Sequence, residues 1–150
     1  MSFPTQILPD HHRHCDDLFV AAEDAVQRGD WAAARPACAH FSEQMQAHFI
    51  AEEDLLFPAF EAASGSASGP TRVMRMEHEQ MRLLLVQLEA ACGAHDADAY
   101  AGAAETLLVL MQQHNMKEEN ILYPMCDQVL GQDAERIGAE MGATLEKGHA

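Results

Sequence analysis

Two eleven-residue segments of the chain repeat one arrangement of histidine, glutamate and proline. Residues 48–58 read HFIAEEDLLFP, and residues 114–124 read HNMKEENILYP. In each segment a histidine is followed four residues later by a glutamate, and on an α-helix such side chains point to the same side one turn apart. Each pair could bind one metal ion, or the two pairs could share two. One such pair is expected by chance in this composition, so the recurrence of the whole segment carries the argument.

The repeat continues upstream at a constant offset of 66 residues, the step from 48 to 114 and also from 12 to 78. Each of these four histidines lies on a stripe of apolar residues with helical spacing, so all four are predicted to face the core. Buried imidazoles and carboxylates without partners would be costly. The predicted inward-facing set therefore contains four histidines and two glutamates: His12, His48, His78, His114, Glu52 and Glu118.

The donor types in this set restrict the metal. Nitrogen and oxygen donors without thiolate suit iron, manganese or zinc, whereas calcium and magnesium prefer oxygen alone. Two metal ions are favoured over one. If both carboxylates bridge two six-coordinate metals, positions remain open for a solvent bridge and for small exogenous ligands. The predicted centre is therefore accessible to small molecules.

Other residues near the repeated motifs receive different predictions. His14 lies about 200° around the helix from His12, so it is predicted on the surface, while His11 is ambiguous. Glu53 and Glu119 are predicted to be solvated or to support the ligands, and they become ligands if the helices rotate. The alternative for the two His-Glu pairs is an exposed ion pair, and for the two upstream histidines it is a hydrogen-bonded core histidine.

One aromatic residue follows the glutamate in each segment. Tyr123 and Phe57 occupy matching positions, five residues after the first glutamate of each motif. Packing is the expected role of both, and the alternative for Tyr123 is a hydrogen bond near the metal centre.

Helical segments must position these residues. Glycine-rich or polar breaks separate four long segments that are rich in Ala, Leu, Glu, Gln and Met and apolar at three- to four-residue spacing. They predict helices over about 10–28, 30–61, 71–92 and 97–130, with a short fifth helix at 133–146. The connections are short, which favours an all-α, up-down-up-down antiparallel four-helix bundle. We expect a single domain over 1–150, with repeat halves of about 10–62 and 76–128 related by a pseudo-twofold axis.

Composition narrows the range of partners. Nine Lys and Arg against 24 Asp and Glu give a formal charge of -15, which disfavours binding to nucleic acid and to anionic membranes. The four cysteines form no CxxC pair, so we expect reduced thiols in the cytoplasm. The N-terminus has no signal-peptide pattern, and no apolar run approaches the length of a membrane span. Cations and small ligands are the expected partners, in a monomer or a homodimer.

The doubled HxxxEExxL[FY]P motif, with a single histidine on each alternate helix, resembles the hemerythrin-like (HHE cation-binding) family over about residues 10–128. The resemblance implies a four-helix bundle with a non-haem di-iron centre held by the six residues named above, where O2 or related diatomic ligands bind. Oxygen-carrying hemerythrins have a fifth histidine one turn from the third-helix ligand. Here Met74 and Arg82 occupy those places beside His78, which argues against simple reversible oxygen carriage.

The resulting hypothesis is a cytoplasmic hemerythrin-like protein with two non-haem iron ions, or with manganese or zinc in their place. It would bind or react with O2, peroxide or nitric oxide in a sensing or redox role, and whether it is an enzyme stays open. One alternative is a protein similar to the iron-sulfur-cluster repair proteins of the same superfamily, which carry an additional N-terminal domain with a Cys motif that this sequence lacks. Others are a metal buffer or sensor read by a partner protein and a zinc-stabilised structural bundle.

Overall fold

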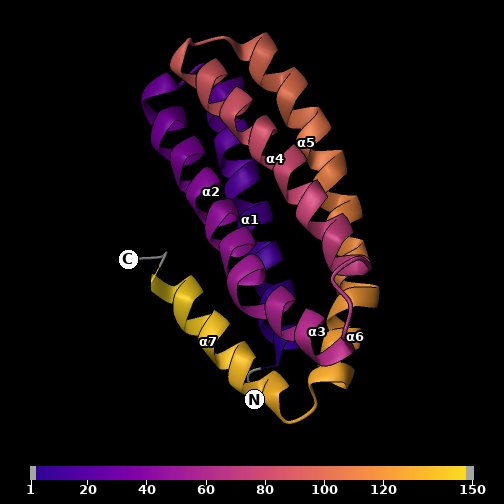
Figure 1. The fold of residues 1–150 in the computed structure, drawn as a ribbon. Coiled ribbons are helices and arrows are strands. Elements are labelled where there is room, and N and C mark those ends of the chain that lie inside the picture. Colours follow the sequence, from indigo (N-terminus) through magenta and orange to yellow (C-terminus); the bar gives the residue numbers. More distant parts are fainter. Residues whose placement is uncertain (1–2, 148–150) are drawn as a thin grey trace.

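The computed structural model describes residues 3–147 and is all-α in that range (Figure 1). Four long antiparallel helical rods form a bundle, and a further helix from the C-terminal part runs back along one side of it. The first rod is α1 (Pro4–Gln27) and the third is α4 (Pro70–Gly93). The second rod consists of α2 (Trp31–Ala51), η1 (Glu52–Leu56) and α3 (Phe57–Ser64), and the fourth of α5 (Ala97–Lys117), η2 (Glu118–Leu122) and α6 (Tyr123–Leu130). The last helix is α7 (Asp133–Lys147).

The two halves of the bundle repeat each other element by element. The helices α1 and α4 both have 24 residues, α2 and α5 both have 21, and α3 and α6 both have eight. Their N-caps repeat as well: the Asp30 carboxylate accepts a hydrogen bond from the backbone N–H of Ala33, and the Asp96 carboxylate accepts one from Ala99. The all-α antiparallel bundle predicted from the sequence is confirmed.

The second and fourth rods each contain a π-helical turn, which the sequence reading of 30–61 and 97–130 as uninterrupted α-helices did not include. In η1 the backbone N–H of Phe57 donates to the carbonyl of Glu52, five residues back, and in η2 Tyr123 donates to Glu118 in the same way. A proline follows each turn, and its ring has no N–H and clashes with the preceding turn of an α-helix. A turn widened by one residue carries the backbone past that ring.

The first helix begins earlier than predicted, whereas the last helix, predicted at 133–146, is found at Asp133–Lys147. The first helix begins at Pro4 rather than near residue 10, because a proline is well accommodated at the first helical position. Pro9 lies inside this helix, whose first turns are held by burial of Leu8. The C-terminal helix, predicted at 133–146 as weakly apolar, nevertheless has a fully buried face formed by Ala134, Ile137, Met141 and Leu145.

The buried core consists of two apolar clusters, one toward each end of the bundle. One fills the end formed by the α1–α2 and α4–α5 turns, and the other joins α3, α6 and α7 to the start of α1. In the first rod Leu8 belongs to the second cluster and Cys15 to the first, and His12 lies between them. In the third rod His78 lies between Met74 and Met81 in the same way. A polar layer therefore crosses the bundle between two apolar regions.

None of the helices in the described part of the chain combines the length and the apolarity needed to cross a bilayer.

Candidate metal centre

The structure brings the six predicted residues together in this polar layer. All six are at most 5% exposed, and Glu52, His78 and Glu118 are completely buried. The nitrogens His12 Nε2 and His114 Nε2 lie 3.1 and 3.2 Å from Glu118 Oε1. On the other side, His78 Nε2 and His48 Nε2 lie 3.0 and 3.6 Å from Glu52 Oε1. Each carboxylate thus faces one histidine of its own rod and one of a rod from the other half.

The donor atoms of this layer form two overlapping groups, each compact enough to surround one cation. The first group is made of Glu52, His78, His114 and Glu118, and the second of His12, His48 and Glu118. Within each group the donor atoms lie within 4.8 Å of one another. Because Glu118 belongs to both groups, the layer has the composition of two adjacent metal positions that share a carboxylate.

The hydrogen bonding of the layer leaves room for a cation. Among residues 3–147, Glu118 Oε2 and His114 Nε2 are buried and form no hydrogen bond, although His114 Nε2 lies 3.2 Å from Glu118 Oε1. Buried polar atoms normally form hydrogen bonds. Two that form none, both of them atoms that can bind a metal, indicate that a cation fits between these side chains. Imidazole nitrogen and carboxylate oxygen together fit iron, zinc or manganese.

The outer ring nitrogens of two of the histidines are held by the second glutamates of the repeated motifs. Nδ1 of His12 lies 2.7 Å from Glu119 Oε2, and Nδ1 of His78 lies 2.7 Å from Glu53 Oε2. Arg82 donates to both oxygens of Glu53, at 2.9 and 2.7 Å, and so fixes this carboxylate in place. These glutamates therefore orient the imidazoles and turn their Nε2 atoms inward.

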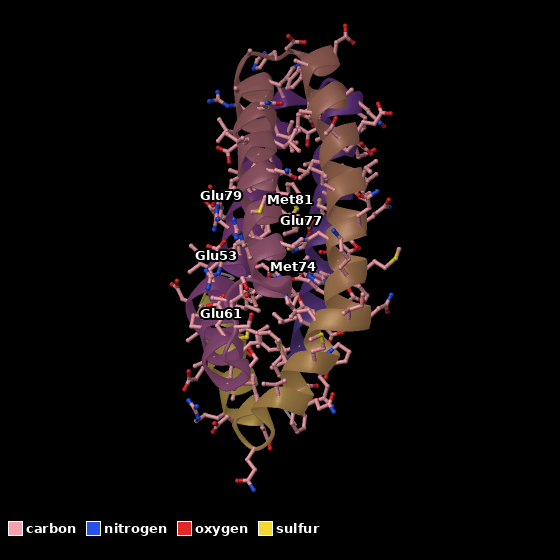
Figure 2. All side chains as sticks on the ribbon, turned by 45° about the vertical axis from the view of Figure 1, so that its right-hand side comes forward. Glu53, Glu61, Met74, Glu77, Glu79 and Met81 are labelled. Carbon is pink, nitrogen blue, oxygen red and sulfur yellow. The ribbon has the colours of Figure 1, made fainter. Side chains whose placement is uncertain are left out.

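The other two histidines have different outer partners. Nδ1 of His114 lies 2.8 Å from Glu77 Oε1, and Glu77 lies between α4 and α5, where it also pairs with Lys117 (Figure 2). Nδ1 of His48 lies 2.8 Å from Nδ1 of His11. The ambiguity about His11 is thus resolved: it is buried and contacts a site histidine.

Sequence reasoning missed Glu77 and misplaced His14. Glu77 and His11 are related by the offset of 66 and directly precede the third- and first-rod histidines, a signal that could have assigned both to the outer contacts. The prediction that His14 lies on the surface is wrong in part, because this residue is half-buried, with its ring 5.8 Å from that of His11. It lies beside the polar layer rather than in it.

Tyr123 contributes a hydroxyl to the layer, whereas Phe57 contributes only packing. The Tyr123 hydroxyl lies 2.7 Å from Glu52 Oε2 and 2.8 Å from Glu118 Oε1, and it donates to these carboxylates. It also lies 3.2 Å from His12 Nε2 and 3.4 Å from His48 Nε2. The packing expected for Tyr123 is therefore supplemented by the hydrogen bond considered as its alternative, and only one half of the bundle has such a donor.

We expect Tyr123→Phe to destabilise the metal-free protein by about 1–3 kcal/mol, because two buried carboxylates lose their shared donor. Urea unfolding in the presence of a chelator measures this loss. The metal-loaded variant should lose less, since a bound metal would satisfy the same oxygens. Phe57 shows that phenylalanine fits the matching place in the other half, so the fold should persist. An unchanged urea midpoint in the metal-free variant would contradict the assigned role.

The electrostatics of the layer favour protonated histidines when no metal competes for them. Burial lowers the pKa of the His114 imidazole, but Glu118 and Glu77 outweigh it and raise the pKa to about 10. Burial is similarly outweighed at His12 and His78, whose pKa values are raised by their carboxylate partners. The pKa of His48 is lowered by burial, which its carboxylate neighbours do not fully offset. The four imidazoles are therefore not equivalent.

A surface cavity of about 500 Å³ reaches the polar layer at His12. Its lining includes Asp16 and Glu119, and it opens between α1 and the fourth rod. The matching residue to Asp16 in the other half is Arg82, which lies over Glu53. An arginine thus lies over one side of the layer, while the cavity on the other side is lined by Asp16, Glu119 and Arg13.

Comparisons with known proteins point in one direction. The family model described as "Hemerythrin HHE cation binding domain" matches residues 4–126. Iron-sulfur cluster repair protein YtfE of Yersinia pseudotuberculosis is 33% identical over 137 residues, and YtfE of Yersinia pestis is 32% identical over 135. Both matches cover 76% of this chain and 59% of the relative, so the chain spans about six-tenths of the length of these proteins. No solved structure matches the chain.

Proposed function

Because this chain belongs to the hemerythrin HHE cation-binding domain family, we propose that it is a non-haem di-iron protein that binds or reacts with O2, peroxide or nitric oxide. The proposed ligands are the six residues of the polar layer: His12, His48, Glu52, His78, His114 and Glu118. One observation carries the proposal. Two overlapping groups of buried His and Glu side chains share Glu118 and include buried polar atoms without hydrogen-bond partners.

Iron at these positions would supply redox chemistry and open coordination sites for a small ligand. The chain supplies the surroundings. The outer contacts of the four histidines hold Nε2 of each ring toward the layer, as required for a metal ligand. Apolar side chains on both sides exclude bulk water, and the Tyr123 hydroxyl, whose oxygen lies 2.7 Å from Glu52 Oε2, holds a proton. That hydroxyl is placed to donate a hydrogen bond within the site.

Metal analysis of the protein purified from its native host, together with its visible spectrum, tests the proposal. We expect about two irons per chain and an absorption that changes on exposure to O2, peroxide or nitric oxide. Zinc as the native metal, with a colourless protein inert to all three, would establish the zinc-stabilised structural bundle instead. A colour change that reverses on deoxygenation would instead indicate reversible oxygen carriage.

A role in iron-sulfur cluster repair is the second candidate function, and the names of the relatives favour it. The two candidate functions predict different assay results. A repair protein restores activity to a damaged cluster enzyme in a purified mixture, whereas a ligand sensor or redox protein changes its spectrum with the small ligand and leaves the damaged enzyme inactive. The sensing or redox role is proposed first because it requires only the site described above.

A cytoplasmic location belongs to the same proposal. It is supported by the four cysteines, which are all buried and free, as expected where thiols remain reduced.

Metal affinity should rise with pH across the neutral range. The pKa values of His12, His78 and His114 are raised, so these imidazoles hold protons that a metal must displace. Below the pKa of such a group, each displaced proton makes the metal affinity rise about tenfold for every unit by which the pH rises. Titration with Zn²⁺ between pH 6 and 8, with proton release followed in weak buffer, measures the effect. Binding without proton release at pH 7 would contradict it.

The same protons stabilise the metal-free fold in a defined pH range. The pKa of His114 is about 10 in the folded protein and lies near 6.5 in an unfolded chain. Because the folded value is the higher one, this contribution is complete below pH 6.5 and is lost as the pH rises toward 10. Metal-free protein should therefore be less stable in urea at pH 9 than at pH 6.

A further inference from the structure

The outer contacts of His48 and His114, on the second and fourth rods, break the symmetry of the site. Three of the four site histidines have a carboxylate on Nδ1, and His48 has the ring of His11 instead. His11 occupies the position of Glu77 in the other half. Its remaining nitrogen, Nε2, lies 3.1 Å from Oε1 of Gln44, which is completely buried. The matching residue to Gln44 is Leu110, so both members of this pair change between the halves.

These contacts determine where the hydrogens lie. An amide oxygen only accepts, so Nε2 of His11 must donate to Gln44. In a neutral His11 the other nitrogen, Nδ1, then carries the lone pair and accepts from Nδ1 of His48, 2.8 Å away. The Nε2 atom of His48 is left without a hydrogen, and it faces Glu52 and Tyr123 at 3.6 and 3.4 Å. This is the tautomer that can bind a metal.

The other half reaches the same orientation with charged groups. Nδ1 of His114 donates to the carboxylate of Glu77, which pairs with Lys117. A carboxylate acceptor on the outer nitrogen makes an imidazole a stronger donor to metal than a neutral acceptor does. The residue that matches Lys117 is Ala51. The charged pair of Glu77 and Lys117 in one half therefore takes the place of the neutral pair of His11 and Gln44 in the other.

We propose that Gln44 and His11 form a neutral hydrogen-bond relay that fixes the metal-binding tautomer of His48 and makes the metal position of His12 and His48 the weaker and more exchangeable of the two. This inference rests on the proposed binding of two metals. It assigns Gln44 and His11 as positioning residues, which act on the metal through His48. It also makes the two positions unequal although the ligand types repeat.

Anaerobic titration of the metal-free protein with Co²⁺, against a competing chelator, tests the proposal. Wild type should bind two Co²⁺ with separate affinities. Gln44→Leu, which installs the residue of the other half, should weaken the weaker step about 10- to 100-fold and leave the tighter step within about threefold. His11→Glu should strengthen the weaker step and narrow the gap. Glu77→Gln should weaken the tighter step, and Gln113→Leu, on the exposed face of α5, should change neither.

Nitrogen NMR of the histidine rings gives a second readout, which loss of stability alone would not change. His48 should carry its hydrogen on Nδ1 in the metal-free wild type and should lose this preference in Gln44→Leu. A hydrogen on Nε2 of wild-type His48, or equal weakening of both Co²⁺ steps in Gln44→Leu, would overturn the relay. If Gln44→Leu fails to fold, an unchanged difference between the two Co²⁺ affinities in His11→Glu would also overturn the relay. Absence of Co²⁺ binding by wild type would instead refute the proposed function.

Discussion

Replacing Glu118 with glutamine should reduce bound iron from about two ions per chain to fewer than one. Glu118 belongs to both donor groups, with His12 Nε2 and His114 Nε2 at 3.1 and 3.2 Å from its Oε1. An amide keeps the shape of the side chain but removes the negative charge that would compensate two buried cations, so both positions should be weakened together. Glu52→Gln should have a similar effect, because Glu52 Oε1 also faces one histidine of each half, at 3.0 Å from His78 Nε2 and 3.6 Å from His48 Nε2.

Metal content of variants purified in parallel, measured by elemental analysis, checks this expectation. Glu105→Gln is the matched control, because Glu105 is exposed on α5 and lies outside the repeated motif. Circular dichroism of each variant separates loss of metal from loss of fold. Full occupancy in Glu118→Gln would refute the shared-carboxylate assignment, and loss of only one metal would limit Glu118 to a single position.

Removing the metal should lower the melting temperature by a margin larger than any single substitution outside the layer. A ligand present at 100 times its dissociation constant stabilises the folded state by about 2.7 kcal/mol per site. For a chain of this size, each kcal/mol corresponds to about 2–4 °C. Two occupied positions should therefore raise the melting temperature by about 10–20 °C over the metal-free protein.

Thermal unfolding with and without a chelator measures the difference, and adding back Fe²⁺ anaerobically shows whether it is reversible. The Glu118→Gln variant provides the control, since its melting temperature should respond little to the chelator. Equal melting temperatures of loaded and metal-free wild type would mean that the layer is stable without a cation. Its carboxylate and imidazolium groups would then pair with each other as an internal salt-bridge network.

The helices could be predicted well from the sequence because their signals are local. Apolar spacing, the N-caps at Asp30 and Asp96 and the glycine-rich breaks each act within a few residues. The π-turns could not be predicted in the same way. A proline such as those at 58 and 124 disturbs a helix, but whether a rod ends, kinks or widens there depends on the packing of the rods that flank it.

The inner part of the site could be predicted because the repeat placed the same donor types on four apolar stripes. The outer contacts could not, because they depend on how the rods are rotated against each other. His11 and Gln44 are 33 residues apart and meet only across the α1–α2 interface. Tyr123 meets Glu52 across 71 residues of sequence. Periodicity places a side chain on a face, but the partner on the adjacent helix is determined by tertiary packing.

The polar layer also divides the molecule mechanically. Burial of apolar surface makes a small domain unfold as one cooperative unit, and here that burial occurs in two separate clusters. A cation bound in the layer would join the two ends of the bundle through side chains of all four rods. Without it, the end formed by α3, α6 and α7 is expected to open and close independently of the other, as local unfolding units do in larger proteins. Occupancy of a buried site would in this way determine whether the bundle behaves as one body or as two.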